Sequence, residues 1–524
     1  MAKTYDSGNA LSQKILKGVN VLADNVASTL GPRGRNVILQ EPGKRPIVTK
    51  DGVTVAQFVT LDDPVENVGA EIIKQASAET NNTAGDGTTT ATVLSRAILT
   101  QAQAFLTAGS SPIELKRGID KAVEVISDRL YKQAKPISSQ EDIAHVATIS
   151  ANGDKVIGQL IATAVDAIGK DGAITVEEAR SLTTALDIVE GFQLGSGFVS
   201  SSFITDERRG AVRYENSYVL VTDGTIDTVD ELLPVLEVVA RENRPLVVVS
   251  ENIEGQALAA LIMNSVRGTL KVAAIKAPRY GEERRNILKD LCYAVGAKFV
   301  SRESGVGLRE VKLEHLGTCK SIEVLKTNTT IVGGGGNYEA LEKRIESLRV
   351  ELSQTENLHE CERLQERITR LSSGVAIIRV GAPTEIEMVE KKHRIEDALE
   401  AVRSAQEEGI VPGGGTALIR AVTNLEVQTE NETQAQGVEI VRRACSDPLR
   451  QMAINAGESP DIVQEKVEAL EDSVSGYDFA AGEIKDLIEV GIIDPVKVTR
   501  TALENAASVA STLITTNHAI IQVD

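Results

Sequence analysis

Apolar positions follow two kinds of pattern, and these divide the chain into helical ends and a mixed middle. From Ser12 to about residue 132, and again from about Glu407 to the end, segments rich in Ala and Val show helical spacing, with glycine-rich joints between them. Because the two ends share this pattern, we expect them to form one helical domain.

The middle of the chain, from about 190 to 375, alternates short β-branched runs with helical segments. The runs lie at 245–249 and 270–275, and the helical segments at 254–267 and 282–294. Strands and helices in alternation predict a partly parallel sheet. Between Asn337 and Ser373, apolar residues at helical spacing are interrupted near Asn357, which predicts an αα-hairpin. Its alternating charges fit a solvated helix face better than an interaction tail.

Two helices of the middle part are apolar over more of their circumference than one buried face requires. The apolar residues cover roughly 220° of the segment from Asp230 to Glu242 and roughly 200° of the segment from Glu254 to Arg267, whereas one core face needs little more than ~100°. Burial on both sides is one explanation. Apolar surface that contacts a binding partner is the other.

Composition narrows the class of protein. A chain of 524 residues is too long for one core, so several domains are expected. No run approaches the ~18 apolar residues of a membrane span, and the polar start lacks a secretory signal, so we expect a cytoplasmic protein without a membrane partner. A net charge of −19 and an aromatic content of 3% disfavour nucleic acid as a partner. Four widely spaced cysteines are typical of reduced thiols.

Three short segments carry candidate chemistry. The segment TLGPRGRN at 29–36 ends a helix near Leu30, where close backbone can meet an anion, although most such helix ends bind nothing. In AGDGTTTAT at 84–92, two glycines and three threonines at a helix start suit phosphate oxygens, and Asp86 suits Mg²⁺. The alternative is an ordinary helix cap. In TKDGVT at 49–54, Lys50 suits phosphate charge and Asp51 an attacking water, yet Asp-Gly alone is only a turn signal.

Taken together, the motifs resemble one family. With TISAN at 148–152, RIEDAL at 394–399, EEGIVPGGG at 407–415 and DPVKVTR at 494–500, they resemble in order and spacing the group I chaperonins of the bacterial Hsp60 system. The resemblance covers essentially the whole chain. It implies a multidomain α and α/β protein: a mostly helical equatorial ATPase domain (1–132 and 407–524), a small intermediate hinge domain (133–189 and 376–406) and an α/β apical domain (190–375).

The resemblance also implies a site for ATP, Mg²⁺ and K⁺. Asp51 and Asp397 would be the catalytic carboxylates, with Asp397 moving in from the hinge segment, and Asp86 would bind Mg²⁺. The cofactor-binding residues implied are Thr29, Leu30, Gly31, Pro32, Lys50, Asp86, Gly87, Thr88, Thr89, Thr90, Gly414, Asp478, Phe479, Ala480 and Asp494.

The same resemblance implies partners. Non-native polypeptides and a co-chaperonin lid would bind an apolar groove, and subunits would form sevenfold rings. The groove residues implied are Phe198, Phe203, Leu233, Leu236, Leu258, Ile262 and Met263.

Several positions depart from the family pattern. Asp478 stands where the family usually has Asn against the adenine, and an ionised carboxylate donates no hydrogen bond. Ser202 replaces a large aromatic residue, and Ser196 replaces an arginine that would pair with Glu385 of a neighbouring subunit. Ser459 and Ala104 replace charged partners between rings, so both a single and a double ring stay open.

We therefore expect an ATP hydrolase that binds, encloses and releases non-native polypeptides. The alternative is a ring-forming scaffold or holdase with a weak or decoupled ATPase. Retention of Asp51, Asp86 and Asp397 favours the first hypothesis, because a scaffold does not need all three carboxylates. A soluble phosphotransferase is disfavoured, since no acceptor-site motif is present.

Overall fold

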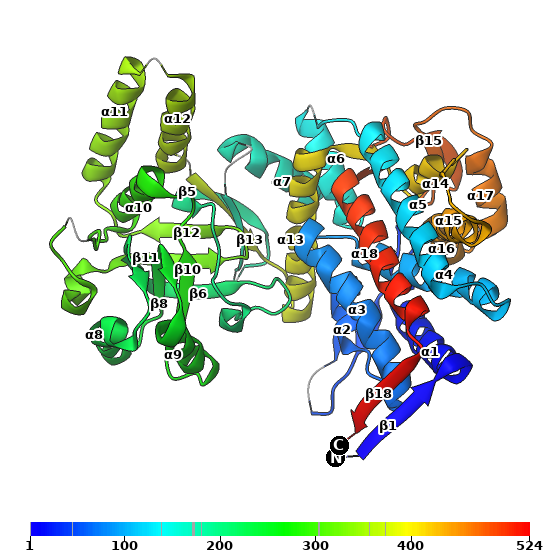
Figure 1. Ribbon diagram of the computed structural model, residues 1–524. Helices are drawn as coiled ribbons and strands as arrows, with labels where there is room; N and C mark the ends of the chain where they lie inside the picture. Colours follow the sequence, from blue (N-terminus) through cyan, green and yellow to red (C-terminus); the bar gives the residue numbers. More distant parts are fainter. Residues whose placement is uncertain are drawn as a thin grey trace. The chain divides into compact units, whose positions relative to one another are not determined.

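The computed structural model describes residues 2–43, 46–137, 139–169, 173–179, 181–301, 304–355, 357–372 and 374–523 (Figure 1). The chain forms two compact units. The helical unit contains Met1–Thr163, Glu178–Thr184 and Val380–Asp524, and the α/β unit contains Ala164–Glu177 and Ala185–Arg379. The three domain boundaries expected from the sequence stay a prediction, because this division separates only two bodies.

Both ends of the chain lie in the helical unit, where strands β1 (Ala2–Ser7) and β18 (His518–Val523) pair antiparallel. The long helices are α1 (Gly8–Ala27), α3 (Pro64–Ala84), α4 (Thr88–Thr107), α5 (Pro112–Gln133), α13 (Glu385–Glu408) and α18 (Val496–Thr515). The shorter helices are α2 (Gly52–Phe58), α6 (Gln140–Ser150), α14 (Thr416–Val422), α15 (Glu432–Ala444), α16 (Asp447–Ala456) and α17 (Pro460–Glu468). Helix α7 (Lys155–Ile168) runs from this unit into the other.

The core of the helical unit consists of small and branched apolar residues from α1, α3, α4, α5, α15 and α18. Close packing depends on glycine at one crossing: a Cβ on Gly18 of α1 would lie 1.8 Å from the carbonyl oxygen of Glu66 in α3. Three short antiparallel pairs complete the unit. They are β2 (Val37–Leu39) with β3 (Ile47–Thr49), β14 (Ile410–Pro412) with β17 (Ile493–Pro495), and β15 (Ser475–Asp478) with β16 (Glu483–Asp486).

The α/β unit is built on an eight-stranded sheet in the order β10-β8-β6-β11-β12-β5-β13-β4. Its strands are β4 (Ala173–Glu178), β5 (Ala185–Leu194), β6 (Val212–Val221), β8 (Leu246–Ser250), β10 (Val272–Lys276), β11 (Gly317–Val324), β12 (Thr329–Gly334) and β13 (Gly374–Val380). Strands β6, β8 and β10 are parallel, whereas β11, β12, β5 and β13 join antiparallel. The predicted partly parallel sheet is confirmed.

Among the described residues, the helices that accompany this sheet include α8 (Val229–Glu242), α9 (Gly255–Val266), α10 (Gly281–Val295), α11 (Tyr338–Gln354) and α12 (Leu358–Ser372). Helices α11 and α12 stand side by side as the predicted αα-hairpin (Figure 1). Asp290 of α10, which is only 2% exposed, connects this helix to the hairpin. Its carboxylate accepts hydrogen bonds from Arg367 Nε at 2.7 Å and from Arg344 Nε at 3.1 Å. The chain therefore adopts the predicted multidomain α and α/β architecture.

No helix within the described ranges is both long and apolar enough to cross a membrane.

Candidate functional site

A cavity of about 380 Å³ in the helical unit gathers residues from distant parts of the chain. It is lined by all of the residues expected to serve catalysis or cofactor binding: Thr29, Leu30, Gly31, Pro32, Lys50, Asp51, Asp86, Gly87, Thr88, Thr89, Thr90, Asp397, Gly414, Asp478, Phe479, Ala480 and Asp494. Segments more than 400 residues apart in sequence thus meet around one space.

One wall of the cavity is the turn after α1. The amides of Thr29 and Leu30 still donate to the helix carbonyls of Val26 and Ala27, each at 3.1 Å, and Gly31 then reverses the backbone with φ +79°. A Cβ on Gly31 would lie 2.7 Å from Cγ of Met452, so glycine is required for both conformation and space.

A second wall is the joint between α3 and α4. Gly85 and Gly87 adopt left-handed conformations that end one helix and begin the next. Gly87 is the N-cap of α4 and, as a glycine, supplies no side-chain cap, while the neighbouring Asp86 carboxylate accepts from its amide. The anion site and the ordinary helix cap both stay predictions. The threonines at 88–90 form the first turn. Their amides and the positive end of the helix dipole suit an anion such as phosphate.

Asp86 lies between these two glycines and is held in place by two donors. Its Oδ1 accepts from the amide of Gly87 at 2.5 Å, and its Oδ2 accepts from Ser150 Oγ of α6 at 3.0 Å. Desolvation raises the pKa of Asp86, the two hydrogen bonds oppose the shift, and the charge of Asp51 adds to it.

Asp494 of β17 brings a further carboxylate to the cavity. Desolvation and the nearby charge of Asp86 raise the pKa of Asp494 to about 7. Gly413 leaves room for this side chain, because a Cβ there would lie 3.1 Å from Asp494 Oδ1. Asp86 therefore experiences repulsion from Asp51 and exerts it on Asp494, and a bound cation would relieve this repulsion.

Lys50 and Asp51 stand at the start of α2. Lys50 Nζ donates to the carbonyl of Gly31 at 3.0 Å. Burial lowers the pKa of Lys50, as does the positive charge of Arg394, whereas Glu390 raises it. The Asp51 carboxylate accepts from the amides of Val53 and Thr54, each at 3.1 Å, and so caps α2.

Helix α13 brings Asp397 to the cavity, together with Glu390, His393 and Arg394 on the preceding turns. Ser404 Oγ anchors this helix by donating to the carbonyl of Ala84, at the end of α3, at 2.7 Å. Arg394 pairs with Glu390 at 2.8 Å. The sequence motifs contained Arg394 and Ser150, but no role was predicted for either, because their contacts join segments far apart in the chain.

Asp478 lies at the end of β15, where its carboxylate is engaged within the protein. Oδ1 accepts from the amides of Ala480 at 2.9 Å and Ala481 at 3.1 Å, and Oδ2 accepts from Lys485 Nζ at 2.9 Å. Burial favours a higher pKa, but these donors outweigh it and the pKa of Asp478 is lowered. Asp478 therefore lines the cavity as an ionised acceptor, which donates no hydrogen bond.

The predicted polypeptide-binding residues lie in the α/β unit and differ in exposure. Leu233 of α8 is 46% exposed and Met263 of α9 is 48% exposed, while Phe198, Leu258 and Ile262 are half-buried. Phe203 and Leu236 are buried in the core of this unit, so their side chains offer no surface to a partner here. Of the apolar residues on α8 and α9, some thus pack in the core of the unit and others are exposed at its surface.

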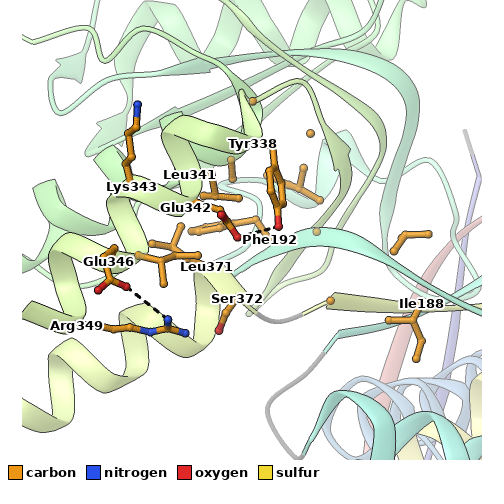
Figure 2. A pocket seen from close by; sticks show the side chains of 18 residues that line it. Ile188, Phe192, Tyr338, Leu341, Glu342, Lys343, Glu346, Arg349, Leu371 and Ser372 are labelled. Carbon is orange, nitrogen blue, oxygen red and sulfur yellow. Dashed lines mark hydrogen bonds and ion pairs between the residues drawn. The ribbon is translucent and has the colours of Figure 1, made fainter.

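The α/β unit holds another cavity, of about 680 Å³, between α11 and strands β5 and β12. Figure 2 shows Phe192 and Leu371 beside it, with charged side chains of α11 around them. Tyr338 donates to Glu342 at 2.8 Å, and Arg349 pairs with Glu346 at 3.7 Å. None of the predicted site residues lines this cavity.

Among the described residues, no group of three or more His, Cys, Asp or Glu side chains is arranged to hold a metal ion.

Comparisons with known proteins agree with this architecture. Two similar solved structures are crystal forms II and I of the chaperonin gp146 from bacteriophage EL 2 (Pseudomonas aeruginosa), both in the presence of ATP-BeFx. They are 22% and 21% identical to this chain, with TM-scores of 0.65 and 0.63, and each match covers 99% of both chains. At this identity they show the fold. A family model described as the TCP-1/cpn60 chaperonin family matches residues 22–524. Because that match spans nearly the whole sequence, this chain belongs to the TCP-1/cpn60 chaperonin family.

Proposed function

We propose that this chain is an ATP-dependent chaperonin subunit, which hydrolyses ATP to bind, enclose and release non-native polypeptides. The observation that carries the proposal is the convergence of seventeen residues, expected from motifs spread over the whole sequence, on one cavity. The first turn of α4, glycines that allow close backbone approach and acidic side chains beside them are features that suit a nucleoside triphosphate with a cation.

The acidic side chains support a cation at the phosphate end. Asp86 is the candidate Mg²⁺ ligand, because this residue lines the cavity beside the start of α4 while Gly87 and Ser150 orient its carboxylate. Mg²⁺ would neutralise phosphate charge and relieve the repulsion between Asp86 and its acidic neighbours. A K⁺ ion beside the phosphates is part of the same proposal and rests on the resemblance alone.

Asp397 and Asp51 are the proposed catalytic carboxylates. Asp397 would accept a proton from the attacking water, and Asp51 would orient that water while it caps α2. Lys50, whose pKa is lowered by burial, would meet the phosphate charge. Since Asp397 belongs to α13 and the phosphate-binding residues to α2 and α4, movement of α13 would make hydrolysis conditional on closure.

Apolar side chains on α8 and α9 are the proposed polypeptide-binding surface. Leu233, Met263 and the half-buried Leu258 and Ile262 lie on neighbouring helices that contact each other. Apolar contact has no directional requirement, so such a surface accepts many sequences. We propose the same surface for a co-chaperonin lid.

The proposed assembly and location rest on the resemblance to group I chaperonins. We propose sevenfold rings of identical subunits in the cytoplasm, as one ring or two, with the three domains expected from the sequence moving against one another during the cycle.

ATP turnover measured together with client capture tests this function. Purified protein should hydrolyse ATP and should suppress aggregation of an unfolded enzyme before nucleotide is added. Client capture without turnover would favour the ring-forming scaffold or holdase, and turnover without capture would contradict the chaperone role.

A further inference from the structure

We propose that the nucleotide cavity discriminates only weakly between the two purine bases, so that GTP is a substrate alongside ATP. The inference rests on the proposed nucleotide site and adds the base preference of that site. Residues 478–480 of the β15–β16 hairpin are the proposed base contacts. The inference follows from the hydrogen bonds that the polar groups of this hairpin make within the protein.

Asp478 has little hydrogen-bonding capacity left for a base. The residue is only 7% exposed. Two backbone amides occupy Oδ1, and Lys485 Nζ occupies one of the two acceptor positions of Oδ2. Because the hydrogen bonds also hold its pKa low, the carboxylate is ionised at neutral pH and has no donor. One acceptor position remains.

The backbone of the same turn is also engaged. The amide of Ala480 donates to Asp478, and the carbonyl of Ala480 accepts from Arg33 Nη2 at 3.0 Å. The amide of Gly482 donates to the carbonyl of Asp478 at 2.7 Å. These groups satisfy one another within the protein and are not directed at a ligand.

Side chains beside the turn are largely apolar. Leu30, Met452, Tyr477 and Phe479 belong to one apolar cluster and also line the cavity. The Tyr477 and Phe479 rings pack edge to face with centroids 5.0 Å apart. Apolar and aromatic walls contact the faces of adenine and guanine equally, because every base has a π-face.

The hydrogen-bonding edges of the two purines differ, but the polar groups of this hairpin do not distinguish them. Adenine offers an amino donor and a ring-nitrogen acceptor, whereas guanine offers an N1–H donor, an amino donor and a carbonyl acceptor. A single free acceptor on Asp478 meets a donor of either base. Strong rejection of an analogue requires buried polar groups that it would leave unpaired, whereas the Asp478 carboxylate, the Ala480 amide and carbonyl and the Gly482 amide already have partners within the protein.

The test compares ATP and GTP on the full-length protein with Mg²⁺. Displacement of a fluorescent ATP analogue gives both dissociation constants, and phosphate release gives both turnover rates. We expect the two dissociation constants to agree within about tenfold, the range of a site without specific base contacts. A preference for ATP above about a hundredfold would overturn the inference and leave the proposed function intact. Failure to bind either nucleotide would overturn both.

Lys485→Met provides a sharper test. Without the lysine, Oδ2 of Asp478 regains an acceptor position, and the carboxylate can accept from N1–H and the amino group of guanine together. The ratio of GTP to ATP affinity should rise at least about threefold. Lys466→Met is the matched control. Lys466 belongs to α17, and its Nζ lies 5.8 Å from the ring centroid of Tyr477, which is part of the same hairpin as Lys485. An unchanged ratio in Lys485→Met would show that the base does not approach Asp478, which would overturn the assignment.

Discussion

Aspartate residues around the helical unit's cavity combine structural and chemical roles. Asp51 caps α2, Asp86 is oriented by Gly87 and Ser150, and Asp478 closes the β15–β16 turn. Motifs in the sequence located all three residues. The partners of Asp86 and Asp478 could not be predicted, since Ser150 comes from a different helix and Lys485 from the opposite strand of the hairpin.

Replacing Asp397 by Ala should slow ATP hydrolysis by a factor of tens or more, since one positioned carboxylate contributes typically ~10²–10⁴. ATP affinity should change little, because the phosphate-binding turns belong to other helices. Single-turnover hydrolysis and equilibrium binding measure the two effects separately. The control is Glu407→Gln, which lies on the same helix as Asp397 and removes an ion pair with Lys497 of α18. A loss of ATP affinity as large as the loss of rate would refute the catalytic role of Asp397.

Cysteine reactivity should separate Cys361 from the other three thiols. Burial raises the pKa of Cys292 and Cys445 to about 12 and that of Cys319 to about 11, so these thiols stay protonated and unreactive from pH 7 to 9. Cys361 is only half-buried. A thiol-reactive dye at pH 8 should label one cysteine per native chain and four after unfolding. Fast labelling of more than one thiol in the native protein would contradict this packing.

Helices and strands of the α/β unit were largely predictable from local pattern. The segments expected at 254–267 and 282–294 are α9 and α10, and the run at 245–249 is β8. Apolar excess on α8 and α9 was visible too, but not which residues face the core. Leu236 is 7% exposed and Leu233 is 46% exposed, although they lie one turn apart. That difference is decided by packing against distant segments.

The buried ion pair of α10 with the αα-hairpin should be important for stability. Asp290→Ala leaves Arg367 buried without its partner, which should lower the free energy of unfolding by about 3–5 kcal/mol. Glu360→Ala, which breaks an exposed pair with Arg363 on the same hairpin, should cost less than about 1 kcal/mol. Urea unfolding, with hydrogen exchange of α10 and α12 to locate the effect, measures both. Equal losses in the two variants would contradict the prediction.

Exposure on α8 and α9 decides which substitutions probe client binding cleanly. Leu233→Ser and Met263→Ser should weaken capture of an unfolded client while stability and ATP turnover stay near those of the unmodified protein. Leu236→Ser removes a buried side chain and should destabilise the α/β unit by about 2–5 kcal/mol, so it is a poor probe of binding. Light scattering of an aggregating client measures capture. Full capture by both exposed variants would show that clients bind elsewhere.

At the scale of the whole molecule, the ends of the chain meet in one unit and the middle forms the other. The sequence predicted that the middle of the chain forms an insert within the helical part. The sheet of that insert, however, begins and ends at other residues than the local sequence pattern indicated. Strand β5 (Ala185–Leu194) and strand β13 (Gly374–Val380) pair with each other and extend the sheet at residues where a connecting region was expected to begin or end. Pairing over such sequence separations is a tertiary effect that periodicity does not reveal.

The cavity of the helical unit and the apolar helices of the α/β unit must act together if the chain is an ATP-dependent chaperonin. The most direct measurement is the yield of active enzyme recovered from a client captured by the purified protein, with ATP and without nucleotide. ATP should raise the recovered activity well above the spontaneous yield, and Asp397→Ala should abolish most of the increase. Equal recovery with and without ATP, despite efficient capture, would contradict an ATP-driven folding cycle and leave a passive holdase.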